Sequence, residues 1–233
     1  MNSQAVLQLL QSKVGSADWS KWQIHRWQFW DYVRYVNGTT QITLFTNPTG
    51  SSDPNSGLQK TLEETNMPST GQFGQVYFIA NQIRCAVEVL PKVRQSAAIQ
   101  ADTGFVAGAL GDAASAINNL FRRGVLIWQI GQKEYQRIER PFLTAPPAYG
   151  VRIQQTATNR KTPMILPRQS YKGRDAYALN PAQMVEPNQT FTLTINFDSA
   201  APTIQVTPAN SVLQTLAVNV GVIFDGYLAR PAQ

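Results

Sequence analysis

The sequence is poor in the residues on which most catalytic and metal sites depend. Its 233 residues include one histidine, His25, and one cysteine, Cys85. A single cysteine excludes an intramolecular disulfide and a multi-cysteine zinc site. A nucleophilic triad needs a histidine base, and His25 lies among tryptophans with no nucleophile motif beside it. We therefore expect that the protein is not an enzyme and has no catalytic residue, no metal site and no cofactor.

Carboxylate pairs can also catalyse, as in glycoside hydrolysis. The strongest candidates, Glu134 and Glu139, are an odd number of residues apart on a predicted strand. Alternate strand residues point to opposite faces, so these two side chains should point apart. Solvated surface charges are the favoured interpretation.

Charged residues are scarce, at 15% of the chain against about a quarter in an average protein. Ser, Thr, Asn and Gln take their place, as in proteins whose outward faces contact other surfaces. The net charge of +6 is mild and its cations are dispersed, so it does not demonstrate a polyanionic partner. No apolar run approaches the roughly 20 residues of a membrane-spanning helix. The first residues lack the pattern of a signal peptide, and we expect assembly in a reducing cytosol.

Frequent turn residues predict short strands. The chain contains 15 glycines and 14 prolines, which imply many chain reversals. Apolar alternation and β-branched residues predict strands at 27–36, 39–46, 75–91, 125–142, 175–179, 189–197, 203–207 and 214–230. The pattern indicates a mainly β fold, an antiparallel sandwich.

Turn chemistry predicts two features near the first strands. Asn37-Gly38 lies between two β-prone runs, a strong signal for a hairpin that pairs 27–36 with 39–46. The polar segment 47–72 follows, and it is rich in turn residues. Loops of this length in compact domains are usually functional or lie at an interface. We therefore expect loop 47–72 to serve a function or an interface and not only to connect two strands.

Two helices are predicted beside the strands. Residues 4–14 carry apolar side chains on one helical face, and the alanine-rich segment 101–123 ends at Gly124. We expect residues 1–26 to form an N-terminal helical arm. Residues 27–233 then form a single β-sandwich domain with the second helix inserted.

The segment 19–36, WSKWQIHRWQFWDYVRYV, holds four of the five tryptophans. From Trp27 onward, alternate residues share one strand face and predict ordinary core: Trp27, Phe29, Val33 and Tyr35. The residues before them have no such explanation. Tryptophan and arginine often dominate interface energetics. The candidate subunit-interface residues are therefore Trp19, Trp22, Trp27 and Trp30.

The cations near these rings leave two other interfaces open. Rings interleaved with cations can stack on bases and bind phosphates, although Asp18 and Asp31 offset two of these charges. A second basic stretch, within 150–174, spreads over a predicted loop and suits a solvated or intersubunit surface. Tryptophan with cations also suits a bilayer surface. The candidate nucleic-acid or lipid contacts are Lys21, Arg26, Arg160 and Lys161.

Five short motifs together resemble the structural proteins of tailless phage virions. They are LFTNPTG at 44–50, KTLEETNM at 60–67, VLIWQIGQKEY at 125–135, VEPNQTFTLTINF at 185–197 and VIFDGYLARPAQ at 222–233. Over about residues 30–233 the chain is similar to jelly-roll capsid proteins of icosahedral bacteriophages. The resemblance implies a jelly roll, which has eight strands in two packed sheets. A double roll needs about sixteen strands, which 233 residues with a helix and long loops can barely hold, so we expect a single roll.

The resemblance also implies a function. Many copies of a structural capsid protein would self-assemble with closed symmetry into an icosahedral shell around the genome. The expected partners are other copies and other virion proteins, with packaged nucleic acid or an internal membrane as further candidates and no small-molecule substrate. The expected location is the virion, assembled in the bacterial host cytoplasm. Two alternatives stay open: a minor virion protein of the same fold, serving as vertex, decoration or host-attachment component, and a nucleic-acid-binding or carbohydrate-binding β-sandwich unrelated to virions.

Overall fold

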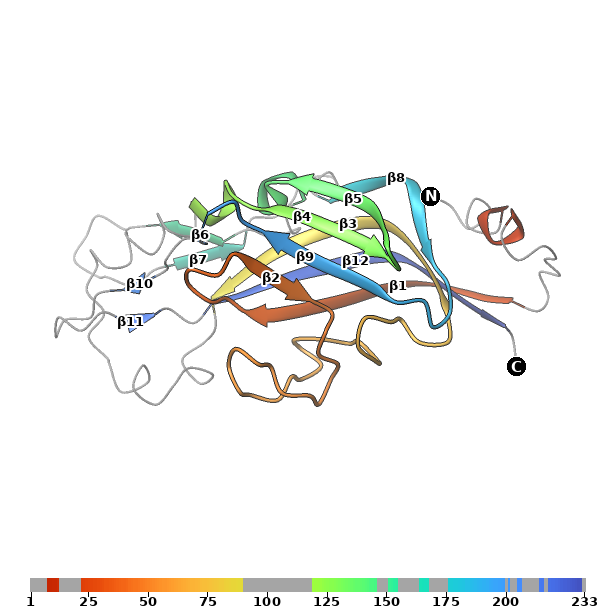
Figure 1. Cartoon of the computed structure of the whole chain (residues 1–233), viewed down its shortest axis with the longest axis horizontal. Coiled ribbons are helices and arrows are strands. Elements are labelled where there is room, and N and C mark those ends of the chain that lie inside the picture. The colour runs from red at the N-terminus through yellow and green to blue at the C-terminus, as the bar shows by residue number, and fades with distance from the viewer. Residues whose placement is uncertain are drawn as a thin grey trace.

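The computed structural model describes residues 8–12, 22–89, 119–145, 151–154, 164–167, 176–199, 201, 205–206, 214–215 and 218–231. Within them, two four-stranded antiparallel sheets pack face to face, as the two layers in Figure 1 show. The prediction of a mainly β antiparallel sandwich is confirmed.

Each sheet is named by its first strand. The β1 sheet has the order β1 (Trp22–Arg34), β12 (Val218–Pro231), β3 (Tyr77–Val89), β8 (Tyr177–Val185). The β2 sheet has the order β2 (Gln41–Leu44), β9 (Phe191–Asn196), β4 (Val125–Ile130), β5 (Lys133–Glu139). One short helix, α4 (Pro141–Thr144), follows β5.

Two small two-stranded sheets lie at one end of the sandwich (Figure 1). They pair β6 (Val151–Gln154) with β7 (Met164–Pro167), and β10 (Gln205–Val206) with β11 (Gln214–Thr215). The segment between β2 and β3 contains loop 47–72. It lies beside β1, along the lower side of the sandwich in Figure 1.

The core follows from the period-two pattern of the strands. In β9, Phe191, Leu193 and Ile195 point inward and are buried, while the residues between them are not. Trp128 of β4 is fully buried, and its ring centroid lies 4.8 Å from that of Phe224 on β12. Such aromatic contacts across the two layers fix how the sheets pack on one another.

The long pairing of β1 with β12 sets the position of the tryptophan-rich segment. It runs antiparallel without interruption from Trp22, opposite Pro231, to Arg34, opposite Asn219. Gly221 lies opposite Tyr32, and the tyrosine ring occupies the space that a Cβ there would need. β1 comes first in the strand order of its sheet and is bonded to β12 on one side only. It is an edge strand.

The predicted hairpin between 27–36 and 39–46 is wrong. A turn does form at Asn37-Gly38, where Gly38 has a φ of +75°, but it leads from one sheet to the other. β1 pairs with β12 and β2 pairs with β9. The turn reverses the chain, but β2 finds its backbone partner in β9, so Val33 and Ile42 enter the same core from opposite sheets.

Other boundaries also differ. β1 begins at Trp22 rather than at about residue 27, so Trp22–Arg26 belong to the sheet. The segment 125–142, predicted as one strand broken at Gly131, is a hairpin of β4 and β5 that turns at Gly131, which has a φ of +61°. Of the predicted helix 101–123, residues 119–121 are helical and residues 122 and 123 are not, while residues 101–118 lie outside the described residues.

The N-terminal segment is described at residues 8–12, which form a helical turn. Leu10 is 3% exposed and packs with Ile79, Ala182 and Ala229, away from the main core. This part of the chain therefore covers the outer face of its own β1 sheet. The division of the chain at residue 26 into arm and domain stays a prediction.

Candidate subunit interface

Three of the four predicted interface tryptophans lie on β1. Trp22 and Trp30 are half-buried, and Trp27 is 47% exposed. Of the predicted nucleic-acid or lipid contacts, Arg26 is on the same strand. The remaining candidates, Trp19, Lys21, Arg160 and Lys161, lie outside the described residues.

Trp27 corrects the prediction that it belongs to the core. It shares a strand face with Phe29, which is 4% exposed, yet it is the most exposed large aromatic side chain among the described residues. The opposite edge strand, β2, has 4 residues against 13 in β1. At about 3.3 Å per residue, β2 is too short to cover the whole face of β1.

From Gln28 to Tyr32, the outward edge of β1 is closed by loop 47–72. Asn66 receives a hydrogen bond from the Trp30 backbone N–H at 2.9 Å and donates one to the Gln28 carbonyl at 2.8 Å. The Tyr32 N–H donates to the Glu64 carbonyl at 2.7 Å. These contacts satisfy backbone groups that an open edge strand would offer to another chain.

A buried ion pair holds this loop to the strand. Lys60 Nζ lies 2.5 Å from Asp31 Oδ1, and the two side chains are 1% and 0% exposed. Asp31 Oδ2 accepts the Phe45 backbone N–H at 2.6 Å, and the Thr65 hydroxyl also bonds to this carboxyl group. Burial raises the pKa of Asp31, while the charge of Lys60 opposes that rise.

The loop is itself tightly bonded. Gly50 N–H donates to the Lys60 carbonyl at 2.9 Å, and Lys60 N–H donates to the Ser51 carbonyl at 2.8 Å. This small ladder leaves two leucines facing solvent, Leu58 at 49% and Leu62 at 67% exposure. Exposed leucines on an ordered loop are available for contact without further ordering.

The other half of the β1 edge is open among the described residues. Outward backbone groups alternate along an antiparallel strand, and those of Trp30 and Tyr32 point away from β12. Ile24 and Arg26 are an even number of residues away on the same strand, so their backbone N–H and C=O groups also point away from β12. No residue in the described part of the chain hydrogen-bonds to them.

A shallow hollow adjoins this open edge. It has a volume of about 420 Å³ and is lined by Arg26, Trp27, Gln28 and Trp30. Trp30 Nε1 donates to the Leu62 carbonyl at 3.1 Å, which joins the hollow to the loop. The open edge, the hollow and the exposed Leu62 are therefore neighbouring parts of one surface, which we call the β1–loop surface.

The charges on this surface are compensated. Asp225 of β12 is 1% exposed at its side chain and bonds to Arg26 at 3.0 Å and to Arg84 at 3.1 Å. The hydrogen bond from Arg26 to Asp225 raises the pKa of Arg26. Because Asp225 partly neutralises both guanidinium groups, this surface offers a phosphate backbone little free positive charge.

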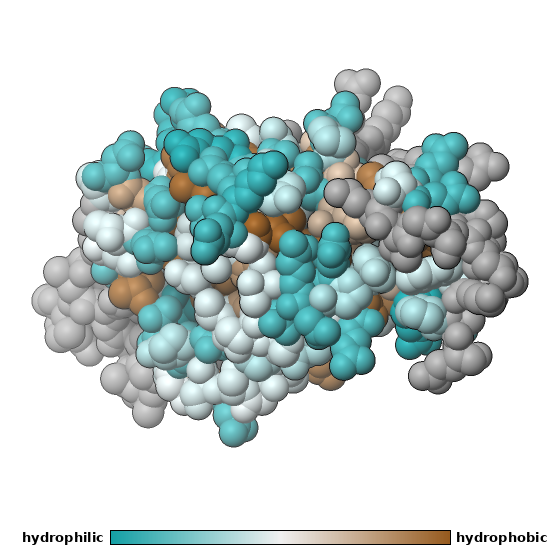
Figure 2. All heavy atoms as spheres, turned by 45° about the vertical axis from the view of Figure 1, so that its right-hand side comes forward, coloured by the Kyte–Doolittle hydropathy of each residue, from teal (hydrophilic) through white to brown (hydrophobic). Residues whose placement is uncertain are grey.

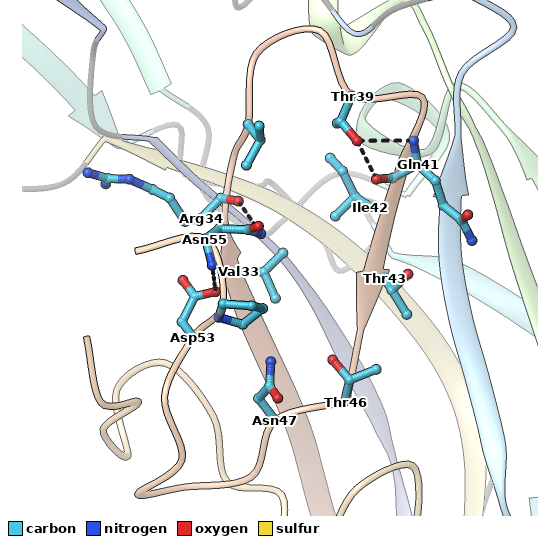
Figure 3. A pocket seen from close by; sticks show the side chains of 12 residues that line it. Val33, Arg34, Thr39, Gln41, Ile42, Thr43, Thr46, Asn47, Asp53 and Asn55 are labelled. Carbon is cyan, nitrogen blue, oxygen red and sulfur yellow. Dashed lines mark hydrogen bonds between the residues drawn. The ribbon is translucent and has the colours of Figure 1, made fainter. Parts of the chain in front are cut away.

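A second hollow, of about 250 Å³, lies where β1 ends, beside β2 and loop 47–72 (Figure 3). Asn55 bridges it, with its side-chain amide donating to the Arg34 carbonyl at 3.3 Å. Asp53 accepts hydrogen bonds from the Asn55 N–H and the Ser56 hydroxyl. Its carboxylate is thus engaged in shaping the loop, and Figure 3 shows mostly neutral side chains along the walls.

No three His, Cys, Asp or Glu side chains among the described residues lie close enough together to hold a metal ion. Cys85 is fully buried, and burial raises the pKa of its thiol. No helix in the described part of the chain is both long and apolar enough to cross a membrane.

Three anchoring residues were missed by the reasoning from sequence: Asp31, Lys60 and Asn66. One signal was present for Asp31, because it occupies the inward face of a strand between Phe29 and Val33. An acid at such a position needs a buried partner. Nothing local identifies Lys60 as that partner, since it lies in a loop far along the chain.

Comparisons with protein-family models, with curated proteins and with solved structures found no match to this chain.

Proposed function

We propose that the protein is a structural capsid protein whose copies assemble into an icosahedral phage shell, with the β1–loop surface as a contact between copies. One observation carries the proposal. Exposed Trp27 and Leu62 are held on an ordered strand and loop, next to a strand edge that is open among the described residues. Such a surface suits association and offers nothing for catalysis.

The strand order supports a jelly roll as the finer description of the sandwich. The two main sheets contain eight strands. Taken in chain order, the first pairs with the eighth, the second with the seventh, the third with the sixth and the fourth with the fifth, as β1–β12, β2–β9, β3–β8 and β4–β5. Rolling up one long antiparallel hairpin produces this nested pairing, which we propose as the fold of the subunit.

Surface composition is compatible with packing between copies. The face in Figure 2 shows small hydrophobic patches separated by neutral and hydrophilic residues. Interfaces between subunits resemble ordinary surface in overall polarity and are depleted in Lys and Glu near their centres. A single exposed tryptophan in such a setting can contribute much of the association free energy.

The N-terminal arm, residues 1–26, is proposed to contact a neighbouring copy as well. Leu10 is already buried against its own β1 sheet, and Trp22 is half-buried in the same cluster. Described residues of the predicted arm are thus anchored to their own subunit. The proposed contact with a neighbour falls on residues outside the described ones, Trp19 among them.

Assembly of the purified protein tests the proposal. We expect sedimentation velocity and negative-stain electron microscopy to show shells of uniform diameter. The double variant Trp27→Ser/Leu62→Ser should remain folded by circular dichroism and fail to assemble. Tyr135→Ser is the matched control, because Tyr135 is 36% exposed on β5, away from the β1–loop surface.

Two results would contradict the proposal. One is a double variant that assembles as well as the wild type. The other is a wild-type protein that stays monomeric across salt and pH while binding single-stranded DNA with steep salt dependence, since phosphate contacts release counterions. That result would favour a nucleic-acid-binding module.

A further inference from the structure

Lys60 and Asp31 are placed as the two reactants of an amide bond. The amine nitrogen lies 2.5 Å from the carboxylate oxygen Oδ1, and both side chains are almost entirely excluded from solvent. We propose that Lys60 Nζ condenses with Asp31 Cγ to form an intramolecular amide cross-link between loop 47–72 and β1. The inference does not depend on the function proposed above.

The burial of Asp31 favours one of the reactive protonation states. Attack requires a neutral amine and a neutral carboxylic acid, and a low-dielectric site disfavours the charged form of the Asp31 carboxyl group. Moving one proton along the hydrogen bond from Nζ to Oδ1 produces that neutral pair. Burial raises the pKa of Asp31, which acts in the same direction.

The second carboxylate oxygen is held by a donor suited to stabilising developing charge. The Phe45 N–H lies 2.6 Å from Oδ2, where negative charge collects when the amine adds to Cγ. Phe45 has a φ of +63°, a left-handed conformation that a phenylalanine rarely adopts. Strained backbone of this kind often occurs at functional sites. The Thr65 hydroxyl is a second polar partner of the same carboxyl group.

The reaction balances without any co-reactant. The ammonium transfers one proton to Oδ1, the neutral amine attacks Cγ, and the new C–N bond forms. A second proton passes from nitrogen to the Oδ1 hydroxyl, the C–Oδ1 bond breaks, and one water leaves. Oδ2 becomes the amide carbonyl oxygen, and one hydrogen stays on nitrogen.

Fixed proximity provides the driving force that free reactants in water lack. Well-oriented intramolecular groups reach effective molarities of about 10⁵–10⁸ M. Exclusion of water from the site also opposes hydrolysis of the product. Nothing more is required than folding of loop 47–72 onto β1.

Mass spectrometry of the full chain tests the proposal. The denatured wild-type protein should have a mass lower than its sequence mass by one water molecule. Trypsin should fail to cleave after Lys60, and a branched peptide should join the Lys60 segment to the Asp31 segment. Lys60→Arg should have its full sequence mass, because a guanidinium does not condense. Lys133→Arg, a matched change on β5, should keep the mass loss of the wild type.

The wild-type measurement decides the matter even if Lys60→Arg folds poorly. A folded wild-type protein with its full sequence mass and only linear peptides would overturn the proposal. So would a mass loss accompanied by normal cleavage at Lys60, because dehydration would then have occurred elsewhere. Neither result depends on whether shells assemble.

Discussion

The two halves of β1 differ in what covers them. Both pair with β12 in one continuous register, and both are rich in aromatic residues. The half from Gln28 to Arg34 is closed at its edge by loop 47–72 and is mostly buried. The half from Trp22 to Trp27 has an open edge among the described residues and is mostly exposed. Sequence composition alone therefore does not decide whether an edge strand becomes core or contact surface.

The edge strand β5 of the opposite sheet carries charged side chains along its length. β5 carries Glu134 and Arg137, joined by two hydrogen bonds of 2.9 Å, and Lys133 lies 5.5 Å from the centre of the Tyr135 ring. Exposed charges of this kind discourage pairing with another chain. The open half of β1 carries one such charge, on Arg26, which is paired with Asp225 and lies beside the exposed ring of Trp27; this makes it the better candidate for association.

The closed half should be most sensitive to loss of its buried cation. Lys60→Met leaves Asp31 buried without its counter-charge, and we expect the free energy of unfolding to fall by about 3–5 kcal/mol. Urea denaturation measures the change, and the proposed amide would add to it. Lys133→Met on the exposed β5 edge should change it by less than about 0.5 kcal/mol. Equal losses of unfolding free energy in Lys60→Met and Lys133→Met would show that the closed edge of β1 depends no more on its lysine than the exposed edge of β5 does.

Acid should reduce the penalty of Lys60→Met. Burial raises the folded-state pKa of Asp31, and removal of Lys60 raises it further. A group with a raised folded pKa favours folding below its unfolded value of about 3.9 and loses that contribution as pH rises through the folded pKa. The stability gap to the wild type should therefore narrow on acidification, by about 1.4 kcal/mol per pH unit between the two pKa values.

Urea titrations of both proteins from neutral pH to about pH 4 would measure this gap. If the amide forms, the wild type has no titratable carboxyl group at residue 31, and the gap narrows through Asp31 of the variant alone. If it does not form, the raised pKa of wild-type Asp31 makes the narrowing smaller. A gap that stays constant or widens would show that Asp31 is not buried as an unpaired acid in the variant.

Closure of the β1 edge should depend on Asn66 to a smaller degree. Asn66→Ala removes two hydrogen bonds to the β1 backbone, and we expect a loss of about 1–2 kcal/mol in the free energy of unfolding. Hydrogen exchange at the Trp30 amide should accelerate, because that N–H loses its acceptor. Asn55→Ala is the control, since its side chain makes one bond at an exposed site and leaves the Trp30 amide protected.

Local patterns could predict the elements of this fold but not which of them meet. The alternating pattern of 189–197 correctly predicted the strand that forms β9, whose residues Phe191, Leu193 and Ile195 are buried. The turn at Asn37-Gly38 was correctly located, yet its strands belong to different sheets, because a turn signal carries no information about partners. The Asp31–Lys60 pair depends on a long-range fold of loop 47–72, which no periodicity reports. The exposure of Trp27 depends on the length of β2, in the opposite layer.

The open half of β1 should tolerate loss of its largest side chain. Trp27→Ala should change the free energy of unfolding by less than about 1 kcal/mol, because the ring is 47% exposed and meets the main core only at Phe29, with ring centroids 6.5 Å apart. Phe29→Ala, two residues along the same face, should cost about 3–5 kcal/mol, because that ring packs in the main core against Phe73 and Phe78. Urea denaturation of the two monomeric variants compares them directly. Similar losses would mean that Trp27 is part of the core after all, and the β1–loop surface would then lose its central contact residue.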